Sequence, residues 1–397
     1  MEFRSTVLDN GLEIVAECNP RAYSCALGFF VKAGSRDECD QNHGVSHFLE
    51  HMTFKGTPTR TAADVNRELD EIGSHSNAFT SEEQTVYFVA ILPEYQDRAL
   101  ELLCDILRPS LREEDFEMEK QVILEEIAKY EDQPPFGAHE KCMLQHFGDH
   151  PLGRSILGTT ASVGGLTRTQ MLDYFRQRYS PRNIVLAAAG NVDFPRLVEQ
   201  TGRWTAAWEA FDAPRIATRA SGYGPPASLH KPLAVQEYVI QIANGPASED
   251  DDRYAGRALA TIVGDESGSR MFWALVDTGW AEYAATNASE YQGTGVFMTY
   301  LCCAPEDTAR NLACLEQIYD EVQQRGVDES ELVQAKSKIC SYIVLQSERP
   351  LNRMFSVGSA WIANREYLTV RELLTRYESL TCRDVAEVLQ RYPLTPN

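Results

Sequence analysis

The stretch HGVSHFLEHMTFKG, residues 43–56, carries an H-x-x-E-H cluster formed by His47, Glu50 and His51. This order is the inverse of the H-E-x-x-H motif found in many zinc sites. On a helix, His47 and His51 lie one turn apart on the same face, and two imidazoles held that way suit a tetrahedral zinc ion. Glu50 projects from nearly the same face, where a carboxylate takes the proton of a water that the metal has activated. The alternative is an amphipathic helix whose histidines face solvent or satisfy a hydrogen bond in the core.

Length, composition and charge describe a globular chain with two domains. The 397 residues exceed an ordinary single domain, and 43% hydrophobic residues with 10% aromatics are typical of substantial cores. The formal net charge of −21 argues against nucleic acid and against an anionic membrane surface as partners. This charge suits a cationic or unfolded peptide ligand, although an acidic balance also serves solubility alone.

The cysteines and the N-terminus favour a cytoplasmic location. The ten cysteines include no C-x-x-C pair and no regular spacing, a pattern typical of reduced thiols. Met1 leads directly into a strand-like segment, with no signal-peptide pattern before it, and no apolar run approaches the roughly 18 residues of a membrane helix. We therefore expect a soluble, cytoplasmic protein; a presequence that had been removed would leave no trace here.

Periodicity and turn signals predict mixed helices and strands in the first half. Asp9-Asn10-Gly11 predicts a hairpin because both turn positions favour a positive φ. β-branched and aromatic runs bounded by turn residues predict strands, and apolar stripes at helical spacing predict helices. Strands are expected within 3–17, 24–33, 85–92 and 183–189, and helices after the motif helix at 61–73, 94–107 and 112–131.

The acidic helix expected at 112–131 carries two glutamates, Glu119 and Glu126, two turns apart on one face. Apolar residues such as Phe116 and Ile123 lie on or beside that face, which would place the two carboxylates on the inward side of the helix. An inward carboxylate is costly unless it is paired or bound to a metal. The alternative is that both glutamates belong to a solvated acidic face.

Three further histidines, His139, His146 and His150, are spaced as on a helix. Gly148 and Pro151 break that helix, and no acidic residue is suitably placed beside them. We therefore interpret these histidines as solvent-facing or packing residues.

The second half of the chain repeats the plan of the first half without its metal-binding residues. The repeated stretches are 293–322 with 82–107, and 328–343 with 112–127. At the offset of the second pair, Glu119 is matched by Ala335 and Glu126 by Tyr342, and the single histidine of the second half, His230, lies in a region rich in proline and glycine. This pattern indicates a duplicated domain in which the first copy alone kept metal ligands.

Three stretches, HFLEHMTFKGT, NAFTSEEQTVY and EKQVILEEI, together resemble the pitrilysin-type zinc peptidases. This H-x-x-E-H, or inverzincin, family includes the mitochondrial processing peptidase and shorter bacterial homodimeric peptidases. The resemblance implies an α+β fold made of two homologous α/β domains, each an antiparallel-rich sheet flanked by helices. We expect a zinc-binding catalytic domain at 1–210, a linker at 211–232 and a metal-free homologous domain at 233–397. The family runs on into one more strand after the position of Asn397, so either the chain is truncated or that strand is dispensable.

The resemblance also implies a role for each residue of the metal site. One zinc ion per chain is expected on His47, His51 and Glu126, with Glu50 as the general base. Glu119 matches a glutamate that orients a ligand of the metal. Two imidazoles, a carboxylate ligand and one open position are typical of a catalytic zinc site.

The resemblance further implies how a peptide substrate is held. Asn77 and Ala78, followed by Phe79, match an edge strand to which the substrate backbone adds as an extra strand. Tyr283 matches a tyrosine that contacts the substrate carbonyl or the oxyanion. The arginine that usually lies seven residues before that tyrosine is replaced by Val276, and loss of such a donor weakens transition-state binding by about 3 kcal/mol. The alternative is that Arg270, in SGSRMF, or a water substitutes for it.

Two functions follow from the resemblance. The first is a zinc endopeptidase that cleaves peptides or unfolded, extended polypeptide segments inside an enclosed chamber. The second is a non-catalytic or partner-dependent member of the family that serves as a binding or assembly subunit; the replaced arginine is its support. We expect a two-fold homodimer in which Tyr283 of one chain faces the zinc of the other. The physiological substrate, and a heteromeric partner in place of a second copy, are left open.

Overall fold

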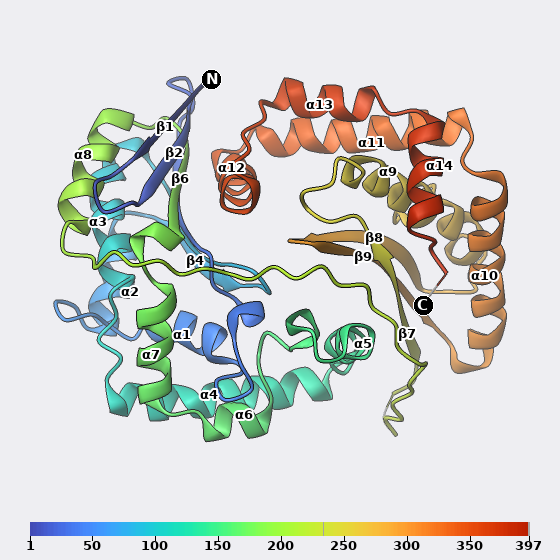
Figure 1. The fold of residues 1–397 in the computed structure, drawn as a ribbon, viewed down its shortest axis with the longest axis horizontal. Helices are drawn as coiled ribbons and strands as arrows, with labels where there is room; N and C mark the ends of the chain where they lie inside the picture. Colours follow the sequence, from blue (N-terminus) through green and yellow to red (C-terminus); the bar gives the residue numbers. More distant parts are fainter. Residues whose placement is uncertain (233, 396–397) are drawn as a thin grey trace. The chain divides into compact units, whose positions relative to one another are not determined.

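The computed structural model describes residues 1–232 and 234–395, and their contacts divide the chain into two compact units (Figure 1). Unit 1 consists of Met1–Lys129, Arg154–Ile216 and Leu345–Tyr367, and unit 2 of Tyr130–Gly153, Ala217–Val344 and 368–395. Each unit contains an antiparallel-rich sheet with helices packed on it. The expected α+β class is therefore confirmed.

The two units interleave along the sequence, since each is built from three separate segments. The expected domains at 1–210 and 233–397, with a linker between them, instead describe two sequence repeats, so those boundaries stay a prediction. Leu233, at the expected start of the second domain, and Asn397, after which the family has its last strand, lie outside the described residues.

Six strands form the sheet of unit 1, in the order β1-β2-β6-β3-β5-β4. The β2–β6 pair is parallel, and the other four pairs are antiparallel. The expected hairpin joins β1 to β2, where Gly11 takes a φ of +86° that glycine adopts without strain. The strands are β1 (Glu2–Val7), β2 (Glu13–Cys18), β3 (Cys25–Val31), β4 (His75–Thr80), β5 (Thr85–Ile91) and β6 (Ile184–Gly190).

Burial follows the position of each strand in this sheet. Every residue of β3 and β6 is buried, as their continuous apolar sequences require in the centre of a sheet covered on both faces. Strand β4 lies at the edge, and its burial alternates: Asn77 and Phe79 are exposed, whereas Ala78 between them is buried. The resemblance placed these residues on an edge strand, and they lie on one in this sheet; their role toward a substrate stays a prediction.

Helices from the first half of the chain cover one face of the sheet and form its larger core. Strand residues such as Leu27 and Phe29 pack there against Phe48 and Leu49 of α1. A capping box between Thr61 and Asp64 starts α2, within the helix expected at 61–73. The helices of unit 1 in this half are α1 (Val45–Thr53), α2 (Ala62–Glu71), α3 (Gln96–Ile106), most of α4 (Glu113–Asp132), α6 (Thr160–Gly165), α7 (Arg168–Arg178) and α8 (Phe194–Thr205).

The other face of the sheet is covered by α12 (Pro350–Asn364), a helix from the second half of the chain. Phe30 points to this face because successive side chains of a strand alternate, and it packs in a separate core with Met354 and Val357. Glycine permits the close approach: a Cβ at Gly358 would lie 2.3 Å from the Phe30 ring.

A buried ion pair fixes α12 to β2. Arg353 donates from Nε to Glu17 Oε1 at 2.9 Å, and the Tyr367 hydroxyl donates to Glu17 Oε2 at 2.9 Å. Glu17 and Arg353 are 3% and 5% exposed, so both charges depend on each other for compensation. The helix is thereby fixed in register on the sheet.

Unit 2 contains a three-stranded antiparallel sheet in the order β7-β9-β8. Its strands are β7 (Glu237–Gly245), β8 (Tyr283–Tyr291) and β9 (Thr294–Cys303). Helices α9 (Arg253–Gly264), α10 (Thr308–Arg325), α13 (Val370–Glu378), α14 (Cys382–Arg391), α5 (Ala138–Phe147) and most of α11 (Glu329–Ser347) belong to this unit. Helix α5, from the first half of the chain, contacts β7 of this unit. Across the described residues, no helix is long and apolar enough to span a membrane.

Candidate metal centre

The motif helix α1 is held in place at its N-terminus by a buried carboxylate. Glu38 accepts hydrogen bonds from the backbone N–H of Gly44 at 2.8 Å and of Ser46 at 2.7 Å. Gly44 precedes the helix with a φ of 92°, a conformation open to glycine. These bonds satisfy N–H groups that a helix start leaves without partners, so the first turn is fixed just before His47.

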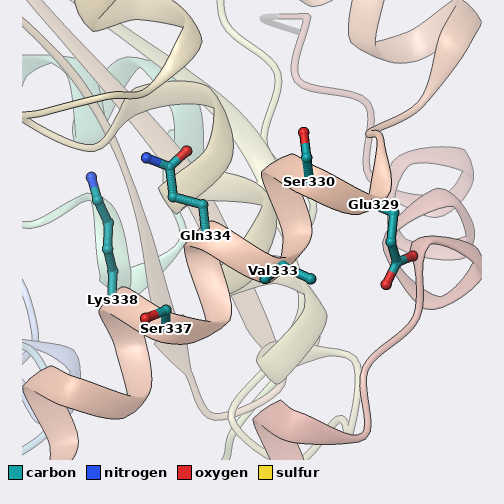
Figure 2. Close-up of a pocket in the computed structure, with 6 residues that line it drawn as sticks. All are labelled: Glu329, Ser330, Val333, Gln334, Ser337 and Lys338. Atoms are coloured by element: carbon teal, nitrogen blue, oxygen red, sulfur yellow. The ribbon is translucent and has the colours of Figure 1, made fainter.

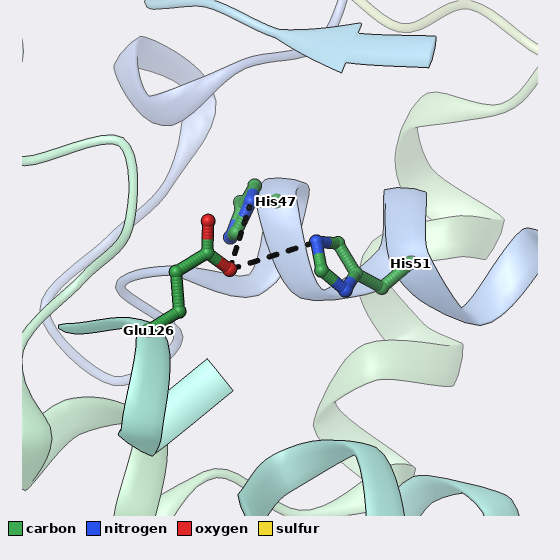
Figure 3. Close-up of side chains that lie close together, drawn as sticks. All are labelled: His47, His51 and Glu126. Carbon is green, nitrogen blue, oxygen red and sulfur yellow. Dashed lines mark ion pairs between the residues drawn. The ribbon is translucent and has the colours of Figure 1, made fainter. Parts of the chain in front are cut away.

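The two motif histidines face the same carboxylate on α4 (Figure 3). His47 Nε2 lies 3.9 Å from Glu126 Oε2, and His51 Nε2 lies 3.8 Å from the same oxygen. The ligand-capable atoms of these three residues lie within 4.8 Å of one another. The structure thus brings together the three residues that the sequence proposed as metal ligands.

This geometry fits a bound zinc ion. Both N···O distances are too long for a hydrogen bond. They are close to the roughly 3.3–3.6 Å expected for two donors that each lie about 2.0–2.2 Å from one tetrahedral ion. Burial, together with neighbouring His51, lowers the pKa of His47 to about 4, so its imidazole is neutral and its lone pair is available to a metal.

Glu119 connects the site to its surroundings. Its Oε1 lies 2.9 Å from His51 Nδ1, and its Oε2 lies 2.5 Å from the ammonium of Lys55. The side chain is almost wholly buried, at 5% exposure, so the carboxylate lies on the inward face of α4 and not on a solvated face. The contact fixes the ring of His51 and leaves Nε2 directed at Glu126.

An aromatic contact fixes α4 against α1. The rings of Phe48 and Phe116 stack with their centroids 4.7 Å apart and their planes at 14°. Both residues are fully buried. This contact sets the separation of the two helices that supply the candidate ligands.

Glu50 lies beside the candidate ligands, with 9% of its surface exposed. Burial raises the pKa of its carboxyl group, as expected for a charge moved away from water. The Thr80 hydroxyl donates a hydrogen bond of 2.8 Å to Glu50 Oε2. A carboxylate with a raised pKa, one residue from a candidate ligand, is placed to accept a proton and return it.

Strand β4 brings a free sheet edge close to this site. Helix α1 packs against β4. In the described part of the chain, β4 pairs with β5 and has no strand on its other side. The ring of Phe79 lies 5.8 Å from that of Phe355 on α12, away from the buried face that carries Ala78.

The residues of interest in the second half belong to unit 2. Tyr283 begins β8 and is 38% exposed; partial burial and nearby Glu266 raise its pKa. Val276 ends a π-helical turn, Phe272–Val276. Arg270, the alternative to the missing family arginine, is held by the carboxylate of Glu331 at 2.7 and 2.8 Å. The role of Tyr283 stays a prediction.

The three histidines His139, His146 and His150 have other partners or surroundings. His139 Nδ1 lies 2.7 Å from the Tyr300 hydroxyl, and His150 Nε2 lies 3.0 Å from the Thr218 hydroxyl. His146 is buried, and burial lowers its pKa. Within residues 1–232 and 234–395, His47, His51 and Glu126 are the one group of three or more histidine, cysteine or acidic side chains close enough together to hold a metal ion.

A pocket also lies along α11, remote in sequence from the motif (Figure 2). Its lining residues are Glu329, Ser330, Val333, Gln334, Ser337 and Lys338. They come from successive turns of one helix and include no histidine or cysteine, so this pocket offers no comparable donor set.

Sequence reasoning missed two residues of the site, Thr80 and Lys55. Strand alternation carried a signal for Thr80, because it shares a face with Ala78, the buried residue of the edge strand. Lys55 follows His51 by four residues, but α1 ends at Thr53, so helical spacing did not indicate its contact with Glu119.

Two protein-family models match the chain. The family model described as Insulinase (Peptidase family M16) matches residues 13–160, and that described as Peptidase M16 inactive domain matches residues 165–339. The chain belongs to peptidase family M16. The predicted resemblance to the pitrilysin-type peptidases is therefore confirmed, as is the predicted duplication into two related domains.

Individual proteins named as proteases or peptidases are similar to this chain in sequence or in fold. An uncharacterized zinc protease of Mycobacterium tuberculosis is 32% identical over 391 residues, which cover 97% of this chain and 89% of that protein. The mitochondrial-processing peptidase subunit beta of Neurospora crassa is 28% identical over 403 residues, covering 97% and 84%. A crystal structure of a protease from Helicobacter pylori has a TM-score of 0.90 at 21% identity, covering 98% and 96% of the two chains, which shows the same fold.

Proposed function

We propose that this member of the family is a zinc-dependent endopeptidase that cleaves peptides and unfolded, extended polypeptide segments. The observation that carries the proposal is the convergence of His47, His51 and Glu126, with the carboxylate of Glu50 beside them. Two imidazoles and one carboxylate leave a position for water or substrate, as catalytic zinc sites require. The similarity to proteins named zinc proteases supports the same conclusion.

Each residue then has a defined task. His47 Nε2, His51 Nε2 and Glu126 would hold one zinc ion, which would supply Lewis acidity to the peptide carbonyl and to the attacking water. Glu50 accepts the proton of that water and delivers it to the leaving amine. Glu119, with Lys55 on its other oxygen, keeps the ring of His51 in one orientation.

The free edge of β4 supplies the place for a substrate. An extended peptide adds to such an edge through main-chain hydrogen bonds and needs no fixed sequence. Asn77, Ala78 and Phe79 form the middle of this edge, on the strand whose last residue contacts Glu50. An extended backbone is available in peptides and unfolded segments but not within folded domains, so these define the substrate class.

A role in assembly is proposed in addition for the second half of the chain. We propose a two-fold homodimer in which Tyr283 acts at the zinc of the partner chain and the two chains enclose the substrate. Mixing Glu50→Gln chains with Tyr283→Phe chains tests this arrangement, because a mixed dimer regains one site with both residues intact. Activity returns on mixing if Tyr283 acts in trans. No recovery between chains shown to exchange would contradict the arrangement, and a monomeric mass in solution would contradict the dimer.

The competing function is a non-catalytic binding or assembly subunit. Val276 at the position of the family arginine favours it, and Arg270 is engaged with Glu331. Zinc content and cleavage of an internally quenched peptide, measured with and without a chelator, separate the two functions. The endopeptidase requires bound zinc and cleavage that the chelator abolishes; a zinc-loaded protein that leaves a broad peptide library intact would be a binding subunit.

A further inference from the structure

We propose that Thr80 is a positioning residue that fixes the carboxylate of Glu50 relative to the strand on which the substrate lies. The inference deepens the proposed endopeptidase function and rests on it. The Thr80 hydroxyl donates a hydrogen bond of 2.8 Å to Glu50 Oε2. Among the described residues, no other side chain donates a hydrogen bond to this carboxylate. The terminal torsion of a glutamate side chain is intrinsically broad, so one directed hydrogen bond determines which oxygen is held and which is left for water.

The direction of this hydrogen bond follows from its neighbours. Thr80 pairs with Thr85 across β4 and β5, and their hydroxyl oxygens lie 3.5 Å apart. The Thr85 hydroxyl donates to the backbone carbonyl of Ala33 at 2.9 Å, so its proton is already committed. A carboxylate only accepts, and the proton of Thr80 is therefore the one that reaches Glu50.

Thr80 is also held rigidly enough to act as a reference point. It is the last residue of β4 and shares the inner face of that strand with buried Ala78. Its partner Thr85 is fully buried on a strand bonded to central β3. A hydroxyl fixed by the sheet in this way transmits the position of the strand to the carboxylate on α1.

Unit 2, which contains none of the three candidate metal ligands, has a strand that can be compared with β4. In β8, Asn287 and Ala288 pair with Met298 and Phe297, as Asn77 and Ala78 pair with Phe88 and Tyr87 in β4. The two strands therefore align at one register, with each β8 residue 210 positions after its β4 counterpart.

At this register, Thr80 is replaced by Glu290. That residue pairs with Gly295 in place of Thr85, and its carboxylate is held by Arg257 at 2.6 and 2.8 Å. The Asn-Ala pair is thus present in both units. The threonine occurs in the unit that has a general base to hold, which is what a positioning role for Thr80 requires.

The proposal has a kinetic consequence. A peptide that adds to the edge of β4 binds through backbone groups, which loss of the Thr80 hydroxyl leaves in place. The orientation of Glu50 matters when the proton moves, so the loss falls on kcat and on kcat/KM alike and leaves KM unchanged. A hydrogen bond to a charged group corresponds to about a 10- to 100-fold change in rate.

The test compares Thr80→Val, which removes the hydroxyl at nearly constant shape, with Thr80→Ser, which retains it. Thr6→Val, on the far edge strand β1 of the same sheet, controls for the loss of a threonine hydroxyl. All are purified as full chains, loaded with zinc, and assayed on one quenched peptide. We expect kcat of Thr80→Val to fall about 10- to 100-fold at unchanged KM and zinc content, with Thr80→Ser close to the parent and Thr6→Val equal to it. A Thr80→Val enzyme with the parent kcat, a loss confined to KM, or a serine variant as impaired as the valine variant would overturn the proposal.

Crystal structures of the same zinc-loaded proteins give a readout that does not depend on turnover. In the parent and in Thr80→Ser the Glu50 carboxylate should occupy one position, with Oε2 on the hydroxyl; in Thr80→Val it should shift or spread over several. An unchanged, single position in Thr80→Val would overturn the proposal whether or not the parent cleaves peptides. If the parent does not cleave peptides, the proposed function fails, and these structures alone decide the role of Thr80.

Discussion

The carboxylate of Glu119 lies 2.9 Å from Nδ1 of His51, and this contact leaves the opposite nitrogen of the ring facing Glu126. In the described structure, Glu119 makes no hydrogen bond or ion pair with His47 or Glu126. It acts on the site by fixing one imidazole, while Lys55 compensates its buried charge. The affinity of the site for zinc should therefore depend on Glu119, although Glu119 is not itself a ligand.

Replacing Glu119 with alanine should weaken zinc binding about 10- to 100-fold, because the ring of His51 loses the partner that orients it. The measurement is a competition titration against a chromophoric zinc chelator. Glu114→Ala, an exposed glutamate of the same helix, should bind zinc as the parent does. Equal affinities in Glu119→Ala and Glu114→Ala would remove Glu119 from the site.

Stability of the zinc-free protein should depend on pH through His47. Its pKa in the folded state is lowered to about 4, whereas an unfolded histidine titrates near 6.5. Between these values the unfolded chain binds a proton that the folded chain does not, so the free energy of unfolding falls as pH falls from about 6.5 to 4, by up to about 3 kcal/mol. Urea unfolding of the apoprotein at both ends of this range measures the fall.

His47→Gln should show a smaller fall, because glutamine does not titrate. His75→Gln, at an exposed position on β4, should keep the fall of the parent. The linkage to His47 would be wrong if the parent and His47→Gln lost equal stability on acidification.

Replacing Arg353 with methionine should destabilise unit 1 by about 3–5 kcal/mol, since it leaves the buried carboxylate of Glu17 without its cation. The double variant Glu17→Gln with Arg353→Met should recover part of that loss, because no uncompensated charge remains. Chemical denaturation measures both. Arg349→Met, exposed just before α12, serves as the control. A single variant as stable as this control would show that α12 does not depend on the pair.

Local sequence patterns predicted how residues close together in the sequence are placed relative to one another. Helical spacing was sufficient to place His47 and His51 on one face, and the turn at Asp9-Asn10-Gly11 was sufficient for the first hairpin. The inward direction of Glu119 followed from its apolar neighbours on α4. In each case the physical cause acts within a few residues along the chain.

Contacts between distant segments could not be predicted in the same way. The sequence of α12 shows an amphipathic helix, but nothing in it selects the sheet of unit 1, and Arg353 meets Glu17 across 336 positions. The chain has 58 acidic residues, so charge alone could not show that Glu119 is the partner of Lys55. Assignment of Glu126 as a ligand likewise needed the family resemblance in addition to spacing.

The most direct test of the central claim is the Glu50→Gln variant, assayed for zinc content and for cleavage of a quenched peptide. Glutamine keeps the shape of the side chain but accepts no proton, and Glu50 is not among the candidate ligands. We expect one zinc ion per chain, as in the parent, and a loss of at least about 100-fold in kcat. A Glu50→Gln protein that holds its zinc and cleaves the peptide at the parent rate would contradict it.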